Sequence, residues 1–358
     1  MRHAIFLSLI STTALAALLV APATSKEAAP TKPYSVLRVA KIGGLGGFDY
    51  VYADVAGRRL YVPRSGVANG PRVSVFNLDT LQHLGDIADT NARGVAVDPK
   101  TGHGFASSKP VTMWDTKTLA TIKTIDVQGN PDGILFEPIS KRVFVYSHVA
   151  PNATILNTFD GSVVGTLDLG GMPEQSQSDG KGHLYVTLED KNQIAVVDTK
   201  TMKITAHYNL DDKCTGPAGL GFDAKNHILF AACRTPAMME MLNADTGKIL
   251  ASVPIGTGVD GAGFNPNTME AFSSQGDGTL SIVKEVSPAK FEAEQTLKTM
   301  VSAKTMTLDT KTNRIFLIAA EYGPPPIPPP GTAPAAGGRG AGRGPMLPDS
   351  FSIVEVGR

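Results

Sequence analysis

A unit of about 42 residues recurs seven times along this chain, and no other feature of the sequence restricts the fold as strongly. Each unit holds a short apolar strand that ends in an acid or an amide, a tight turn, and a second strand rich in aromatic and β-branched residues. The residues that close the first strands are Asp54, Asp98, Glu137, Asp179, Asp223, Asn265 and Asp309. This period is typical of the four-stranded blades of a β-propeller.

A second marker closes the third strand in the first five units. It falls at Asn77, Asp115, Asn157, Asp198 and Asn243. Asp and Asn suit these positions because their side chains accept hydrogen bonds from the backbone of the turn that follows. Since no long stretch after the N-terminal segment keeps a helical period, the chain is predicted to be all-β.

The seventh unit lacks a fourth strand, because the sequence ends after a third strand at Ser350–Val356. The missing strand is found at the other end, where Val36–Gly44 resembles the fourth strand Ser162–Gly171. We therefore expect a single seven-bladed β-propeller over residues 34–358, with four-stranded blades. The N-terminal strand is expected to complete the last blade and close the ring, which removes the exposed sheet faces and edges of an open array.

Three segments fall outside this repeat. Residues 1–25 have a charged start, an apolar run over 4–21 and small residues at 23–25, which indicates a secretory signal peptide and a periplasmic or secreted protein. An uncleaved membrane anchor is the alternative, because the run is about long enough to cross a bilayer. Residues 26–33 are predicted to be a disordered linker. Residues 321–350, rich in proline and glycine, are predicted to be a disordered loop in the last blade.

The charge balance limits the partners. Lysine and arginine number 33 and aspartate and glutamate also number 33, so the chain lacks the excess of cations that a dedicated nucleic-acid binder needs. Two cysteines cannot form a zinc finger or an iron–sulfur site by themselves. Cys214 and Cys233 flank the hairpin of the fifth blade, so a disulfide is within reach and an oxidising compartment favours it. Two unpaired buried thiols are the alternative.

No catalytic motif is found. His103, His183 and His227 fall in turns between first and second strands, whereas His83 and His207 lie on fourth strands, and so the histidines do not indicate one metal site. His148 alone follows a second strand. No serine–histidine–aspartate order, phosphate loop or paired-carboxylate motif is present, and no catalytic residue is assigned.

Repeat geometry indicates a different kind of site. Inner strands line the central channel of a propeller, so equivalent positions before them form a ring at one mouth. Five residues before the seven markers stand Asp49, Arg93, Asp132, Glu174, Ala218, Asp260 and Lys304. Six of these seven are ionisable in a chain that is only 18% charged, which indicates either a ligand or ion site or plain solvated loop ends with mutual ion pairs. Loops on the same face add Arg64, His148, Glu189, Arg234 and Gln275.

The repeat resembles the YVTN-repeat β-propellers, the secreted or periplasmic YncE-like proteins of bacteria. The resemblance covers residues 34–358, with Tyr185-Val186-Thr187 matching the motif of the name and Val196–Thr201 and Met113–Thr118 matching the strand–turn signature. It implies the fold but no reaction, since none of the matched residues is catalytic. A WD-type propeller expects a Trp-Asp pair in most blades, whereas Trp114-Asp115 is the only such pair here.

These observations favour a monomeric binding or scaffold protein that uses the channel-mouth face to hold an envelope protein or a small ligand. Whether it is an enzyme stays open, and no cofactor is required. One alternative is a propeller hydrolase or lactonase with a divalent cation at the mouth. The other is a periplasmic nucleic-acid binder that uses Arg64, Arg93, Arg234 and Lys304, which the charge balance does not favour.

Overall fold

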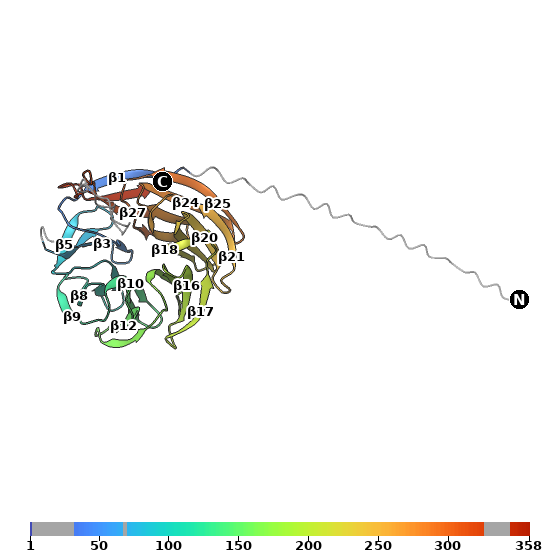
Figure 1. Ribbon diagram of the computed structural model, residues 1–358, viewed down its shortest axis with the longest axis horizontal. Helices are drawn as coiled ribbons and strands as arrows, with labels where there is room; N and C mark the ends of the chain where they lie inside the picture. Colours follow the sequence, from blue (N-terminus) through green and yellow to red (C-terminus); the bar gives the residue numbers. More distant parts are fainter. Residues whose placement is uncertain (2–31, 67–69, 326–343) are drawn as a thin grey trace, which may run out of the picture. The chain divides into compact units, whose positions relative to one another are not determined.

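The computed structural model describes residues 1, 32–66, 70–325 and 344–358. Within these residues, seven four-stranded antiparallel sheets form the ring of blades shown in Figure 1, which confirms the predicted seven-bladed β-propeller. The predicted signal peptide after Met1, most of the linker at 26–33 and the middle of the proline- and glycine-rich segment lie outside the described residues. No helix in the described ranges is long and apolar enough to span a membrane.

The blades follow one another along the chain, each with its inner strand first. Blades one and two are β2 (Tyr52–Asp54), β3 (Arg59–Arg64), β4 (Arg72–Asn77), β5 (His83–Ala88), and β6 (Val95–Asp98), β7 (His103–Ala106), β8 (Val111–Asp115), β9 (Thr121–Ile125). Blades three and four are β10 (Pro131–Glu137), β11 (Arg142–Ser147), β12 (Ala153–Asn157), β13 (Val163–Leu167), and β14 (Pro173–Ser178), β15 (His183–Leu188), β16 (Gln193–Asp198), β17 (Lys203–Asn209). Blades five and six are β18 (Thr215–Asp223), β19 (Ile228–Thr235), β20 (Met238–Asn243), β21 (Ile249–Pro254), and β22 (Val259–Asn265), β23 (Glu270–Gln275), β24 (Thr279–Ser287), β25 (Lys290–Lys298). Blade seven is β26 (Met306–Asp309), β27 (Arg314–Ala319), β28 (Ser352–Gly357) and β1 (Ser35–Lys41).

The ring closes through β1. This strand pairs antiparallel with β28, from Ser35 opposite Gly357 to Lys41 opposite Ser352, and in Figure 1 the blue strand lies beside the red C-terminal strands. Just before β1, the Tyr34 hydroxyl donates a 2.6 Å hydrogen bond to Glu270 of blade six. Both ends of the propeller therefore lie in or beside one sheet, as the sequence predicts.

The marker residues act as turn caps. Asp54 Oδ1 accepts a 2.8 Å hydrogen bond from the backbone N–H of Gly57, and Asp98 Oδ1 accepts one of 2.9 Å from that of Lys100. Equivalent bonds reach Glu137, Asp179, Asp223, Asn265 and Asp309. The markers after the third strands do the same at Asn77, Asp115, Asn157, Asp198 and Asn243. The repeat thus reflects local turn chemistry, because each marker side chain accepts hydrogen bonds from the backbone of the turn that follows it.

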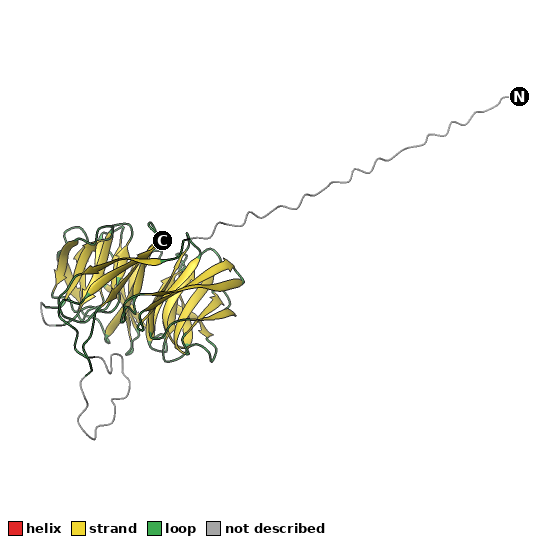
Figure 2. Cartoon of the chain, turned by 90° about the horizontal axis from the view of Figure 1, so that it is seen from above, coloured by secondary structure: helices red, strands yellow, loops and turns green. Residues whose placement is uncertain are grey.

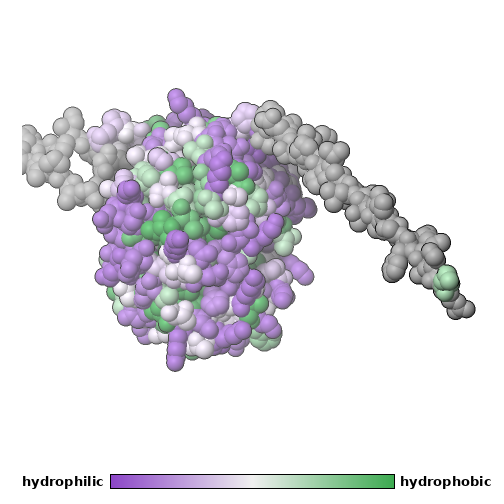
Figure 3. Space-filling view, turned by 90° about the vertical axis from the view of Figure 1, so that its right-hand side faces the viewer, coloured by the Kyte–Doolittle hydropathy of each residue, from purple (hydrophilic) through white to green (hydrophobic). Residues whose placement is uncertain are grey.

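The apolar cores lie between neighbouring blades. Tyr61 of blade one packs on Trp114 of blade two, with ring centroids 5.8 Å apart, and both residues are fully buried. Figure 2 shows the strands of the blades with loops and turns at both ends of the sheets. The side of the propeller in Figure 3 is mostly hydrophilic, with smaller apolar patches among the polar side chains. Each blade is therefore stabilised by burial against its two neighbours.

Two sequence expectations concern local structure. The described ends of the predicted loop at 321–350 pair with each other, since Tyr322 bridges Met346 and the Gly323 N–H donates to the Pro345 carbonyl at 2.9 Å. A disulfide joins Cys214 and Cys233, whose Cα atoms are 5.1 Å apart. Both cysteines are fully buried, so this cross-link fixes the entry of the inner strand of blade five.

Removal of β1 tests ring closure. Deletion of residues 33–41 should lower the melting temperature by about 10 °C or more, because it exposes β28 and the core between blades six and seven. The measurement is thermal unfolding followed by circular dichroism. Val39→Thr is the matched control, since this β1 side chain is largely exposed, and it should melt within about 2 °C of the parent protein. Equal melting of the deletion variant and the parent would contradict closure by β1.

A buried acid in blade five adds a pH dependence. Glu240, on β20, is fully buried. Burial, followed by the hydrogen-bonded Asp211 carboxylate, raises the pKa of Glu240 to about 7. The pKa of a glutamate in the unfolded chain is about 4.3. Between about pH 4.3 and about pH 7, the folded chain therefore keeps a proton on Glu240 that the unfolded chain releases. This stabilisation is complete below the unfolded pKa and is lost as the pH rises through about 7.

We expect Glu240→Gln to raise the free energy of unfolding at pH 8 by roughly 1–3 kcal/mol over the parent protein, with little difference at pH 4. The carboxamide copies the protonated side chain and cannot ionise. Urea unfolding at the two pH values measures the difference. Glu292→Gln, at an exposed position on β25, is the control and should show no pH-dependent difference. A Glu240→Gln effect of equal size at both pH values would argue against this titration.

Candidate functional site

The predicted ring residues gather at one end of the channel. Asp132, Glu174 and Asp260 are the second residues of the inner strands β10, β14 and β22. Asp49, Arg93 and Lys304 stand two or three residues before β2, β6 and β26. Because the second strand of each blade runs back to this end, the loops that follow second strands lie at the same mouth. We call the ion-paired residues described below the mouth network.

One half of the mouth network links blades six, seven, one, two and three. The Lys304 ammonium of blade seven lies between Asp260 and Asp49, with 3.2 Å between Nζ and Asp49 Oδ1. Arg93 continues the series from Asp49, at 3.2 Å, to Asp132, at 3.7 Å. Every step crosses from one blade to its neighbour, and the pair of Lys304 with Asp49 joins the last blade to the first.

In the other half of the mouth network, a cation from a different position compensates for the one ring position that carries no charge. Ala218 takes that position in blade five and is fully buried. Arg234, near the end of β19 in the same blade, supplies a cation there and pairs with both Glu189 and Asp260. Its Nε also donates to the Val259 carbonyl at 3.3 Å. The network therefore takes residues from all seven blades.

Three carboxylates of the mouth network are buried, and Asp49 and Glu189 are partly exposed, whereas the alternative interpretation of the sequence has solvated loop ends. Asp132, Glu174 and Asp260 are 5%, 2% and 5% exposed. Buried ions need close partners, because the cost of removing them from water is several kcal/mol each. Burial tends to lower the pKa of Lys304, but the carboxylates of Asp260 and Asp49 outweigh it and hold this pKa above its ordinary value. Lys304 therefore stays charged at neutral pH.

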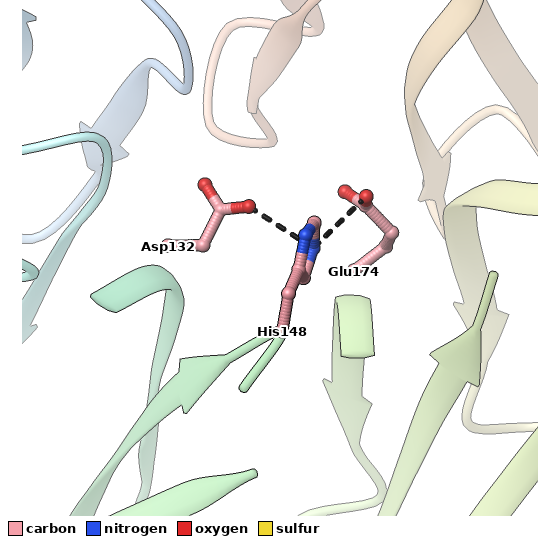
Figure 4. A group of neighbouring side chains, drawn as sticks. All are labelled: Asp132, His148 and Glu174. Carbon is pink, nitrogen blue, oxygen red and sulfur yellow. Dashed lines mark ion pairs between the residues drawn. The ribbon is translucent and has the colours of Figure 1, made fainter. Parts of the chain in front are cut away.

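His148 brings two of the carboxylates together. Its Nε2 lies 3.2 Å from Asp132 Oδ2 and 3.2 Å from Glu174 Oε1, as the dashed lines in Figure 4 show. Ligand atoms of the three residues lie within 4.8 Å of one another, so the three side chains could share a metal ion. The repeat pattern of the sequence predicts all three residues on this face but does not predict that they are in contact. The one feature of the sequence that could have indicated the contact is that the three residues come from the adjacent blades three and four.

The channel behind the mouth contains a cavity of about 340 Å³ that Glu174 and Tyr50 help to line. The Tyr50 hydroxyl of blade one donates to Glu174 Oε2 of blade four at 3.1 Å, and so it reaches across the channel. Gln175 also crosses, since its side chain bonds the Ala262 carbonyl at 2.9 Å and accepts from the Leu220 N–H at 2.9 Å. A second hollow, of about 320 Å³, opens between the loops around Asp49 and Arg93.

Two residues assigned to this face do not join the network. Arg64 is 1% exposed, donates to the carbonyl groups of Gly43 and Gly44, and lies over the Phe351 ring at 3.6 Å. Gln275 is fully buried and bonds the hydroxyl groups of Ser273 and Thr279. Both side chains hold neighbouring loops in place, and neither faces the mouth network.

Comparison with known proteins supports the class of fold. Neither a protein-family model nor a curated protein matches the sequence. Among solved structures, a chain of "Crystal Structure of Mitotic Checkpoint Complex" matches with a TM-score of 0.67 at 15% identity, over 86% of this chain and 96% of that one. "Crystal structure of RRP9 WD40 repeats" matches with 0.69 at 8% identity, over 90% and 97%. "Structure of U3-55K" matches with 0.68 at 8% identity, over 90% and 98%.

These likenesses define the protein as a seven-bladed β-propeller with the ring architecture of WD40 repeats. At such low identity they show the fold alone. The finer resemblance to YVTN repeats stays a prediction.

Burial should decide which ion pairs of the mouth network stabilise the protein. Lys304→Met should lower the free energy of unfolding by about 3 kcal/mol, because it removes the cation that the buried Asp260 shares with the partly buried Asp49. Arg93→Met should cost less than about 1 kcal/mol, since 48% of the Arg93 side chain is exposed. Urea unfolding at neutral pH measures both. Equal losses in the two variants would show that burial does not set their contribution.

Proposed function

We propose that this protein is an exported binding protein whose channel-mouth face captures a partner through a cationic group. The observation that carries the proposal is the unequal charge of the mouth network. Its five carboxylates are Asp49, Asp132, Glu174, Glu189 and Asp260, and its three permanent cations are Arg93, Arg234 and Lys304. A concave, partly desolvated surface with surplus negative charge attracts cations more strongly than an open surface does.

The compartment and the family are part of the proposal. The signal-like pattern of residues 1–25 and the disulfide between Cys214 and Cys233 both favour export to an oxidising compartment. The Tyr185-Val186-Thr187 motif and the strand–turn repeats favour a YVTN-type propeller. An envelope protein with an exposed lysine or arginine side chain is the partner that suits this charge. One structural neighbour is a chain of a multi-protein complex, which agrees with a protein partner.

The nucleic-acid alternative loses support at the mouth. Of its four proposed cations, Arg64 is buried against Phe351. Arg93, Arg234 and Lys304 each lie beside two carboxylates, which would repel a phosphate group. The hydrolase alternative needs a cation at the mouth, and the convergence of Asp132, His148 and Glu174 is the observation that favours it. If the parent protein hydrolyses a lactone or an aryl ester only when a metal ion is added, and His148→Gln does not, the protein has that activity.

The proposed binding is tested with a fluorescein-labelled hexalysine peptide in EDTA at low ionic strength. The parent protein should bind the peptide, and the double variant Asp132→Asn/Glu174→Gln should bind it about 10-fold more weakly, because it removes two of the five carboxylates. Fluorescence anisotropy measures both affinities, and rising salt should weaken the binding of the parent protein.

The matched control removes the same number of charges from the other end of the blades. Asp160→Asn/Asp245→Asn alters two exposed turns after third strands, and it should leave peptide affinity within about 2-fold of the parent value. If the control loses as much affinity as the mouth variant, binding follows net charge and not the mouth network. If neither variant differs from the parent protein, the proposed function is wrong.

A further inference from the structure

The His148 imidazole has an unusual environment within the mouth network. Its Nε2 atom is closed off from solvent and makes no hydrogen bond of acceptable geometry with any described residue. Two carboxylate oxygens nevertheless lie 3.2 Å away, on Asp132 and Glu174. A single Nε2–H group can point at only one acceptor, and here it points properly at neither. Hydrogen bonding therefore does not account for this convergence.

The two separations from His148 Nε2 suit a shared metal ion. Zinc binds imidazole nitrogen and carboxylate oxygen at about 2.1 Å, and bond angles of about 90–110° then place neighbouring ligand atoms about 3.0–3.4 Å apart. Both separations from His148 Nε2 fall inside that interval. Figure 4 shows the imidazole between the two carboxylates, which come from the starts of neighbouring inner strands.

The second oxygen of each carboxylate faces a group from outside the cluster, through a hydrogen bond in Glu174 and through a longer ion pair in Asp132. Asp132 turns Oδ2 to His148, while Arg93 lies 3.7 Å from its Oδ1. Glu174 turns Oε1 to His148, while its Oε2 accepts the hydrogen bond from Tyr50. Outer partners of this kind fix the orientation of ligating carboxylates and are a regular part of metal sites. This arrangement is an observation separate from the clustering of the three ligand atoms.

We propose that Asp132, His148 and Glu174 form a binding site for a divalent transition metal of the zinc or manganese type. The imidazole ligand argues against calcium and magnesium, which prefer oxygen ligands alone. Three protein ligands leave coordination positions for water or a ligand at the end of the channel cavity that Glu174 lines. The metal site rests on the proposed function in one respect, because both use the surplus negative charge of the mouth. A bound divalent ion would offset that surplus and compete with a cationic peptide.

The test is a titration of the full, metal-free chain with Zn²⁺, followed by calorimetry and by metal analysis after gel filtration. The parent protein should bind about one ion per chain. His148→Gln should weaken zinc binding about 10-fold or more, and Tyr50→Phe should weaken it to a smaller extent because it removes an outer partner. Zinc at saturating concentration should also raise the melting temperature of the parent protein and leave that of His148→Gln unchanged.

His183→Gln is the matched control. The His183 imidazole also lies beside a carboxylate, 2.8 Å from Asp179, but it has only one such neighbour and is far more exposed. Its loss should not change zinc affinity at the mouth. Glu174→Gln provides a second variant in case His148→Gln does not fold, and it should weaken zinc binding as strongly.

The proposal is overturned if the parent protein binds zinc no better than His148→Gln, or if calcium competes as well as zinc does. The peptide assay in EDTA tests the proposed function alone, and the zinc titration without peptide tests the metal site alone. Peptide binding without a specific zinc site would leave the proposed function standing alone. Zinc binding without peptide capture would leave only the metal site.

Discussion

Pairing of β1 with β28 is the interaction on which the rest of the structure depends. A propeller blade cannot bury both of its faces alone, and each of these blades is packed between two neighbours. Without β1, blade seven would have three strands, and the core that it shares with blade six would be open to water. Closure also sets how near the inner strands approach one another. Gly219 of β18 shows this limit, since a Cβ atom there would lie 2.8 Å from the Ala262 backbone nitrogen.

The narrow channel that results exposes the unpaired edges of the inner strands to one another. Some of these unpaired backbone groups bond to Gln175, whose side chain makes hydrogen bonds with backbone groups of both β18 and β22. At the mouth the same crowding removes water from Asp132, Glu174 and Asp260. Each carboxylate then needs a partner from another blade, and the alternation of acids and bases around the ring supplies it. The mouth network is thus a consequence of closure as well as a candidate binding surface.

The mouth network is also where stability and function would compete. Lys304 and Arg234 neutralise acids and hold blades together, whereas His148 stands between two acids without a satisfactory hydrogen bond. Sites that keep such an unresolved arrangement are typical of ligand binding, because a ligand then completes what the fold leaves incomplete. The contrast between Lys304 and His148 separates the part of the ring that serves the fold from the part proposed to hold an ion.

The number of blades and the order of their strands can be predicted from the sequence because they follow from local turn chemistry, and the partner of the N-terminal strand follows from the fourth strand that the seventh unit lacks. Asp54 and its counterparts cap the hairpins through contacts two or three residues away, so their spacing is visible in one dimension. The sequence also places the ring charges on one face. Only the tertiary structure decided that Arg234 replaces the missing charge at Ala218, that Arg64 is buried on Phe351, and that His148 lies between Asp132 and Glu174. Those contacts join different blades or separate loops, and their distances are set by the radius and closure of the ring, which no repeat period specifies.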